Sequence, residues 1–200
     1  MSLPGAQYKQ LVTTIKVQDT TYAQQFKYTA ALIVNNSTNN PNNFITINRG
    51  KKHGLLASSG VVSGTGEGIV GITRKVSPHY SVVMSVLNRA IRVSAKIKRN
   101  NYFGVLTWDG KRTDQMVLES VPKHAEINKG DTIVTSGFST MFPEGILIGT
   151  VDSTFIESGS NFHTAYINLF ADVGNLQYVY VINDLMRDER KKLEEAVANE

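Results

Sequence analysis

The stretch AIRVSAKIK, residues 90–98, alternates apolar and polar side chains with a period of two. In an extended chain its two sets fall on opposite faces: Ile91, Val93, Ala95 and Ile97 on one, and Arg92, Ser94, Lys96 and Lys98 on the other. A strand with one face in a core and the other toward solvent has this pattern. The stretch therefore predicts a half-buried β-strand.

Similar short runs follow one another from residue 28 to residue 182, and TAYINLFA (164–171) is the clearest repeat of the alternation. Turn dipeptides separate the runs, among them Asn40-Pro41, Ser77-Pro78 and Asp109-Gly110. About a dozen short strands without a helical pattern between them predict an all-β fold. That is more strands than one small barrel uses, so we expect two small β-barrel subdomains, which leave the fewest open sheet edges.

The two ends of the chain have a different pattern. The first ten residues, MSLPGAQYKQ, resemble an expression leader joined to a fragment, and a weak heptad stripe over 8–26 predicts the remnant of a coiled coil. The last residues, NDLMRDERKKLEEAVANE, predict a surface helix. The expected division is 1–25 leader and end of coiled coil, 26–98 first barrel region, 99–183 second barrel region and 184–200 C-terminal helix. Exchange of strands between the barrels stays open.

The net charge of +4 is unevenly distributed. Residues 49–108 hold ten basic residues and a single acidic one, Glu67, so this segment is +9 and the rest of the chain is −5. A basic segment favours a polyanion partner or, more commonly, forms a solvated positive face. The absence of cysteine excludes disulfides, thiolate metal sites and a cysteine nucleophile. No run of 18 apolar residues occurs.

The stretch GEGIVG, residues 66–71, has the spacing of a dinucleotide-binding loop. That loop needs a helix starting at its last glycine and an acidic residue about 20 positions further on. The β-branched, basic ITRKVSPHY follows instead, and no Asp or Glu occurs from 68 to 108. We therefore expect a tight turn that leads into a strand, and no cofactor. The four histidines lack the spacing of metal ligands, so we expect no metal site.

A two-barrel serine hydrolase is one alternative function. His, Asp and Ser in this order along the chain match chymotrypsin-like proteases, with His53 or His79, Asp109 or Asp114, and Ser136 as candidates. Ser136 lies in VTSGF, which lacks the glycine-rich setting that builds the oxyanion hole of those enzymes. A working triad is therefore the weaker hypothesis.

A basic β-barrel that binds single-stranded nucleic acid is the other alternative. The stretch IRVSAKIKRNNYF (91–103) combines cations with aromatic rings, which is typical of such surfaces. The residues concerned are Arg92, Lys96, Lys98, Arg99, Tyr102 and Phe103. Both rings follow the asparagine turn and do not lie among the cations on the strand face, which weakens this interpretation.

Four motifs resemble a known family: ITINRGKKHGL (45–55), GIVGITRKVSPHYSVVMSVLN (68–88), FGVLTW (103–108) and GDTIVTSGFSTMFPEGILIGTV (130–151). Together, over 26–182, they resemble the extracytoplasmic domain of MreC, the bacterial rod shape-determining protein, and particularly that of Bacteroidetes-like bacteria. The resemblance implies two β-barrels and a scaffold, not an enzyme. It implies a single-pass protein of the inner membrane with this part in the periplasm.

The same resemblance implies the partners. It predicts a link from the MreB cytoskeleton, through MreD and the membrane anchor, to the penicillin-binding transpeptidase and the SEDS glycan polymerase of the elongation complex. Self-association as a homodimer or filament is expected as well, and nucleic acid is not. The resemblance assigns no partner-binding residue.

The signature positions of the family have structural roles in this interpretation. We expect Asp131 to accept hydrogen bonds from turn amides, Gly137 to adopt a positive φ, and Phe142-Pro143 to plug a barrel end. Gly71 and Gly149 are expected where strands cross closely. The full set is Gly50, Gly54, Gly71, Gly130, Asp131, Ser136, Gly137, Phe142, Pro143, Gly145 and Gly149.

Overall fold

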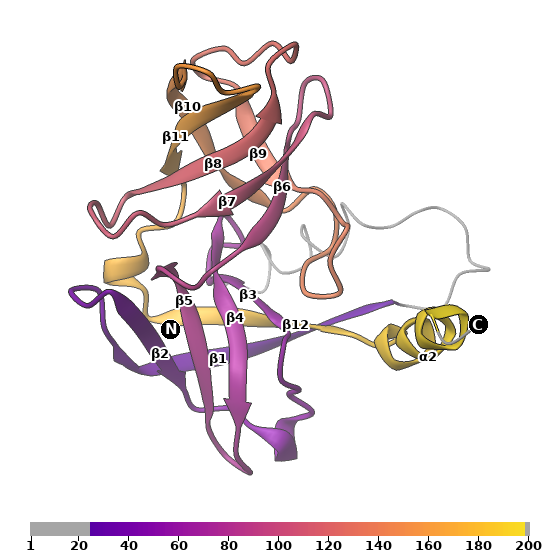
Figure 1. Ribbon diagram of the computed structural model, residues 1–200. Helices are drawn as coiled ribbons and strands as arrows, with labels where there is room; N and C mark the ends of the chain where they lie inside the picture. Colours follow the sequence, from indigo (N-terminus) through magenta and orange to yellow (C-terminus); the bar gives the residue numbers. More distant parts are fainter. Residues whose placement is uncertain (1–24, 199–200) are drawn as a thin grey trace.

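A computed structural model describes residues 25–198 of the chain, and the expected coiled-coil remnant at 1–25 lies almost entirely outside this range. Two closed barrels of six antiparallel strands each are stacked on one another, and one helix projects to the side (Figure 1). The expected all-β class, the two barrels and the C-terminal helix are confirmed.

The first barrel contains β1 (Phe26–Asn36), β2 (Asn42–Ile47), β3 (Gly60–Ser63), β4 (Ile69–Val76), β5 (Ser81–Asn88) and β12 (Tyr178–Asp184). The second contains β6 (Val93–Ile97), β7 (Phe103–Thr107), β8 (Gln115–Pro122), β9 (Thr132–Thr135), β10 (Leu147–Ile156) and β11 (Phe162–Leu169). The 3-10 turns η1 (Lys51–His53) and η2 (Val173–Asn175) and the helix α2 (Arg187–Ala198) complete the described part of the chain.

The expected barrel boundaries, 26–98 and 99–183, differ from the structure at two strands. β6 belongs to the second barrel because it pairs with β7 and β9. β12 belongs to the first barrel because it pairs with β1 over seven residues and with β3 over four. Alternation along a strand specifies its inner and outer faces but not the strands beside it. The sequence pattern therefore could not assign β6 and β12 to a barrel.

Each barrel is filled by the inward-facing side chains of its strands. The stretch that predicted a half-buried strand behaves as expected, because Val93, Ala95 and Ile97 of β6 are buried in the second barrel. In the first barrel the equivalent positions include Ile45, Val83 and Val181. Small barrels have an interior just wide enough for side chains to fill, so these residues form the core.

Two glycines mark close strand crossings. A Cβ at Gly71 would overlap the carbonyl oxygen of Met84 on β5, and a Cβ at Gly149 would overlap that of Asn168 on β11. The expected close approach at both positions is confirmed. In the dinucleotide-like stretch 66–71, the chain turns with positive φ at Gly66 and Gly68 and then enters β4 at Ile69, as the sequence predicts.

Helix α2 follows β12 directly. The carboxylate of Asp184 accepts a hydrogen bond from the Met186 amide at 3.0 Å and pairs with Arg190 at 2.9 Å, which anchors the first turn. Leu193 and Val197 remain largely exposed on the helix. Within residues 25–198, neither α2 nor any other helix has the length and apolar character needed to cross a membrane.

Candidate functional site

The loop between β9 and β10, residues 136–146, is tied back to the end of β9. The Thr135 hydroxyl donates to the carbonyl oxygen of Pro143 at 2.6 Å and accepts from the Ile146 amide at 2.9 Å. Gly137 and Gly145 have φ of 80° and 86°, a left-handed conformation that glycine adopts without steric cost. The positive φ predicted for Gly137 is therefore confirmed, and the loop is a compact unit.

This loop fastens the two barrels together. The Gly60 amide of β3 donates to the Met141 carbonyl oxygen at 2.9 Å, and the Phe142 ring packs against Gly60. Any side chain at position 60 would overlap both the Met141 oxygen and this ring. Phe142 is only 3% exposed. The buried ring thus forms a joint between the second barrel and β3 of the first.

An exposed pair of aromatic rings lies beside the loop. Phe103 on β7 is 39% exposed and Phe138 in the loop is 74% exposed. Their ring centroids are 4.6 Å apart with an angle of 36° between the planes. We call this pair the aromatic ledge. Large apolar side chains exposed together at one point are typical of binding surfaces.

An ion pair lies next to the aromatic ledge. Lys96 lies opposite Phe103 on the neighbouring strand β6, and its ammonium group contacts the carboxylate of Glu144 in the loop.

Behind Phe138, a groove of about 380 Å³ runs along the loop to Phe26 and Arg190. The ledge and groove together could accept an apolar side chain of another molecule. Sequence reasoning missed this site, although a phenylalanine between small polar residues, as in SGFST, is an available signal.

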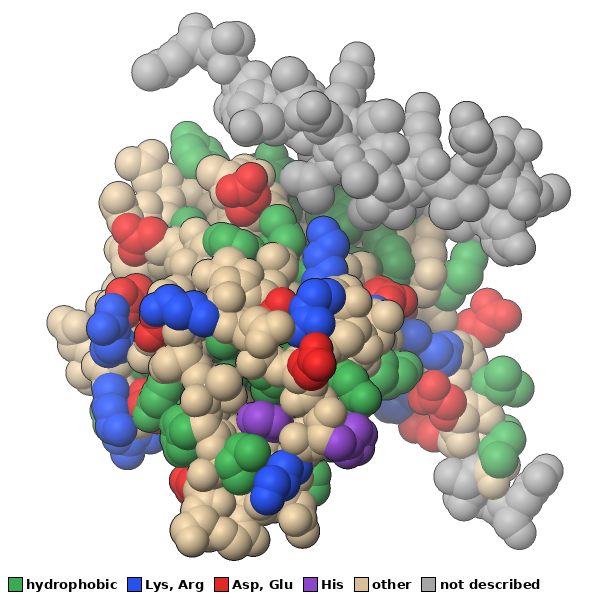
Figure 2. Space-filling model, turned by 90° about the horizontal axis from the view of Figure 1, so that it is seen from above, with side chains coloured by type: hydrophobic (Ala, Val, Ile, Leu, Met, Phe, Trp, Pro, Cys, Tyr) green, Lys and Arg blue, Asp and Glu red, His purple; other side chains and the backbone are tan. Residues whose placement is uncertain are grey.

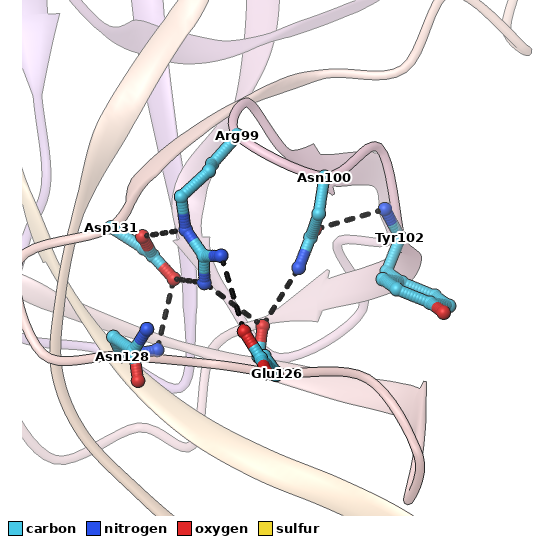
Figure 3. Close-up of polar contacts among 6 residues, drawn as sticks. All are labelled: Arg99, Asn100, Tyr102, Glu126, Asn128 and Asp131. Carbon is cyan, nitrogen blue, oxygen red and sulfur yellow. Dashed lines mark hydrogen bonds and ion pairs between the residues drawn. The ribbon is translucent and has the colours of Figure 1, made fainter.

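At the opposite end of the second barrel, Arg99 holds Asp131 in a two-pronged ion pair, with Nε to Oδ1 at 2.9 Å and Nη2 to Oδ2 at 3.0 Å (Figure 3). The Asn128 amide also donates to Asp131, at 2.9 Å, which confirms the predicted turn role of this carboxylate. The hydrogen bond from Arg99 is the main cause that lowers the pKa of Asp131, and burial opposes it. The Glu126 carbonyl oxygen accepts from Asn100 at 2.8 Å and from Arg99. These bonds join the β6–β7 turn to the segment before β9.

The other signature glycines serve turns and close packing. Gly54 and Gly130 have positive φ, at the end of η1 and at the turn before β9. Gly50 has an extended backbone, and a side chain there would overlap the carbonyl oxygen of Ser77. Its amide donates to His53 Nδ1 at 3.2 Å.

The residues proposed for a hydrolase are not brought together. The buried Ser136 hydroxyl donates to the Ser94 hydroxyl at 2.7 Å and accepts from the Phe138 amide. Within residues 25–198, no histidine or carboxylate hydrogen-bonds to it. His53 lies in η1 of the first barrel, and Asp114 pairs with Arg112. Ser136 is therefore a structural hydroxyl that ties the loop to β6. In the same described range no group of three or more His, Asp or Glu side chains is placed to hold a metal ion.

The cations expected to form a nucleic-acid face are divided among separate contacts. Lys96 pairs with Glu144, and Arg99 pairs with Asp131. Arg92 donates to the carbonyl oxygens of Arg89 and Ile91. Seen from above, the second barrel shows acidic, basic and apolar side chains interspersed (Figure 2). This mixture does not resemble a continuous track for a polyanion.

Two closed barrels joined by a docked loop, with an aromatic ledge exposed beside the joint, define a double-barrel module. The family model described as "Rod shape-determining protein MreC, barrel core" matches residues 33–183. The chain belongs to this family, which is named for cell shape and not for a catalytic activity.

Individual relatives agree with this assignment. The chain is 28% identical over 155 residues to the cell shape-determining protein MreC of Listeria monocytogenes, covering 76% of this chain and 52% of the relative. It is 29% identical over 138 residues to that of Haemophilus influenzae, covering 69% of this chain and 38% of the relative. The chain thus spans about half or less of the length of these relatives.

Solved structures show the same fold. MreC of Listeria monocytogenes superposes with a TM-score of 0.73 at 25% identity, covering 90% of this chain and 87% of the other. MreC in a complex between Penicillin-Binding Protein (PBP2) and MreC from Helicobacter pylori superposes with a TM-score of 0.65 at 20% identity, covering 80% and 99%.

Proposed function

We propose that this chain is the periplasmic scaffold domain of the machinery that elongates rod-shaped bacterial cells. The observation that carries the proposal is the family match, which spans almost the whole double barrel, from 33 to 183. In this role the protein holds wall-synthesising enzymes at the periplasmic face of the inner membrane. It connects them, through MreD and a membrane anchor, to the MreB cytoskeleton.

The direct partner in this proposal is the penicillin-binding transpeptidase of the elongation complex, together with the SEDS glycan polymerase. The Helicobacter relative was solved in complex with a penicillin-binding protein, which supports such a partner for a chain of the same fold. Self-association of the scaffold would place several synthases side by side. A scaffold supplies binding surfaces only, and the aromatic ledge is a surface of this kind.

We assign the transpeptidase contact to the aromatic ledge. Aromatic side chains are enriched among the few residues that carry most of the energy of an interface. Phe103 is fixed on β7, and the Phe138 amide donates a hydrogen bond to the Ser136 hydroxyl, so both rings are positioned before a partner binds. The Lys96–Glu144 pair attaches the same loop to β6. Pre-organised anchors lose little side-chain entropy on binding, so a small contact can still be specific.

The test uses the full-length protein and the penicillin-binding transpeptidase of the same bacterium. The double variant Phe103→Ser/Phe138→Ser should weaken binding by roughly tenfold or more in biolayer interferometry. The matched control is Phe162→Ser on β11, which removes a half-exposed ring elsewhere on the same barrel and should bind like the wild type. Equal weakening in both variants, or none in either, would remove the ledge from the proposal.

A second measurement tests the scaffold role separately. Depletion of the protein should convert rods into round cells, and the wild-type gene should restore them. Cells that keep their rod shape and their rate of wall elongation after depletion would contradict the scaffold function, whatever the ledge binds.

A further inference from the structure

A second hollow lies between the first barrel, the β9–β10 loop and helix α2. It has a volume of about 490 Å³, within the range of sites that hold small ligands or short peptide segments. Ile72 on β4, its cross-strand neighbour Met84 on β5, and Met141 of the loop contribute its apolar floor. We call this hollow the basic cleft.

Four cations surround this floor. They are Arg74 of β4, Arg92 of the segment between the barrels, and Arg187 and Lys191 of α2. Glu194 is the single carboxylate among the lining residues, so the lining carries a charge of +3. The side chains come from three separate parts of the chain, and the fold alone brings them together.

The charge of the basic cleft is poorly compensated within the molecule. Arg187 donates to the backbone oxygens of Ala57 and Ser58, and Arg92 donates to those of Arg89 and Ile91. Backbone carbonyls orient a guanidinium group but leave its net charge in place. Arg74 has no ion pair within the described residues, and Lys191 has one exposed pair with Glu195 at 3.4 Å.

Several arginines outside the cleft, in contrast, have direct carboxylate partners. Arg99 pairs with Asp131, Arg112 with Asp114 and Arg190 with Asp184. The basic cleft therefore concentrates uncompensated positive charge around an apolar surface. It also accounts for part of the excess of basic residues between 49 and 108, because Arg74 and Arg92 lie in that segment.

The arrangement favours one class of ligand. A free phosphate is bound by donors that converge on one point. The cations of the cleft are instead spread around an apolar floor, so the cleft does not suit a free phosphate. A nucleic acid needs a longer basic track with rings for stacking. A peptide with carboxylates on either side of an apolar side chain satisfies both parts of the cleft, because guanidinium forks bind carboxylates in a two-pronged manner.

We propose that the basic cleft binds a short acidic segment of a protein partner, with carboxylates on the cationic rim and an apolar side chain on the Ile72–Met84–Met141 floor. The cleft and the groove behind Phe138 have no lining residue in common: Thr140 and Met141 of the β9–β10 loop line the cleft, and other residues of the loop line the groove. The two surfaces can then be occupied at the same time. One rigid loop would thus support two separate binding partners.

The test starts from a random peptide library displayed on phage and selected on the full-length protein. Selected peptides should be enriched in Asp and Glu next to an apolar residue. Fluorescence anisotropy of an enriched peptide then compares the wild type with Arg74→Glu, a change that breaks no ion pair made within the described residues. Binding should fall by about tenfold or more, and increasing salt should weaken it further.

The matched control is Lys75→Glu, which makes the same change in charge at the next position of β4, outside the cleft. It should bind the peptide within about twofold of the wild type, as should Phe138→Ser at the aromatic ledge. Equal losses in Arg74→Glu and Lys75→Glu would show only diffuse attraction and overturn the proposal. So would selected peptides without acidic residues, or displacement of the peptide by inorganic phosphate or a single-stranded oligonucleotide at equal concentration.

Discussion

The two barrels are alike in size and differ in how the chain closes them. The second barrel uses six consecutive strands, β6 to β11, so all of its pairings lie within residues 93–169. The first barrel uses β1 to β5 and is closed by β12, which follows all six strands of the second barrel in the sequence. Loop-closure entropy opposes such distant pairings, so the first barrel depends on one late strand in a way that the second does not.

Removing β12 should produce the largest difference between the two barrels. A chain that ends at residue 177 loses the pairings of β12 with β1 and β3 and the buried side chains of Val179, Val181 and Ile182. We expect the first barrel to open while the second stays folded. Hydrogen exchange followed by mass spectrometry should show lost protection over 26–88 and retained protection over 93–169. Loss of protection in both barrels would show that the second cannot fold alone.

Glycine substitutions at the strand crossings compare the barrels directly. Gly71→Val in the first and Gly149→Val in the second each force a side chain against a backbone oxygen, at a cost of roughly 3 kcal/mol or more. Each variant should lose hydrogen-exchange protection first in its own barrel. Gly174→Ala is the control, because its Cβ meets nothing closer than 3.5 Å and its φ is not positive. Global unfolding by both valine variants would mean that the two barrels form one cooperative unit.

The loop that joins the barrels should be more tolerant. Gly137→Val places a β-branched residue at a φ of 80° and its Cβ at 2.8 Å from that of Glu144, which should cost roughly 1–3 kcal/mol in urea denaturation. Gly137→Asn should cost less, because asparagine tolerates the left-handed region better than valine. A valine variant as stable as the wild type would show that the loop can shift its path, and would weaken its role as a joint.

The smallest effect concerns the ion pair at the far end of the second barrel. The pKa of Asp131 is lowered in the folded state, so its charged form stabilises the fold above the unfolded pKa of about 3.9. This contribution disappears as the pH falls through the lowered folded value. Asp131→Asn should therefore reduce the Tm at neutral pH, and the difference from the wild type should shrink on strong acidification. Glu157→Gln in an exposed turn is the control, and a pH-independent difference for Asp131→Asn would contradict the ion-pair explanation.

Much of this fold could be predicted from the sequence because its strands alternate so regularly. The stretch 90–98 predicted its own inner and outer faces, and glycines inside strand patterns predicted the crossings at Gly71 and Gly149. The barrel membership of β6 and β12 could not be predicted, because both sequences would fit either barrel equally well. A pattern of period two specifies burial and leaves the neighbouring strand undetermined.

The candidate sites were harder to predict than the fold. Asp131 was expected to bond turn amides, but Arg99, 32 positions earlier, could not be identified as its main partner. The aromatic ledge joins Phe103 to Phe138, and the basic cleft joins Arg74, Arg92 and Arg187. These residues belong to separate elements, and only the closed barrels determine which of them meet.

The pairing of β1 with β12 also determines how the protein responds to mechanical force. Phe26 lies opposite Asp184 and Leu32 lies opposite Tyr178, so the two strands run side by side in opposite directions. A pull between the segment before Phe26 and helix α2 acts on adjacent strand ends and opens the ladder one pair at a time. A pull between the segment before Phe26 and the second barrel acts through Tyr178 at the other end, and loads all seven pairs in shear together. The β1–β12 ladder should therefore separate at a low force when the protein is pulled through helix α2, and only at a higher force when it is pulled through the second barrel.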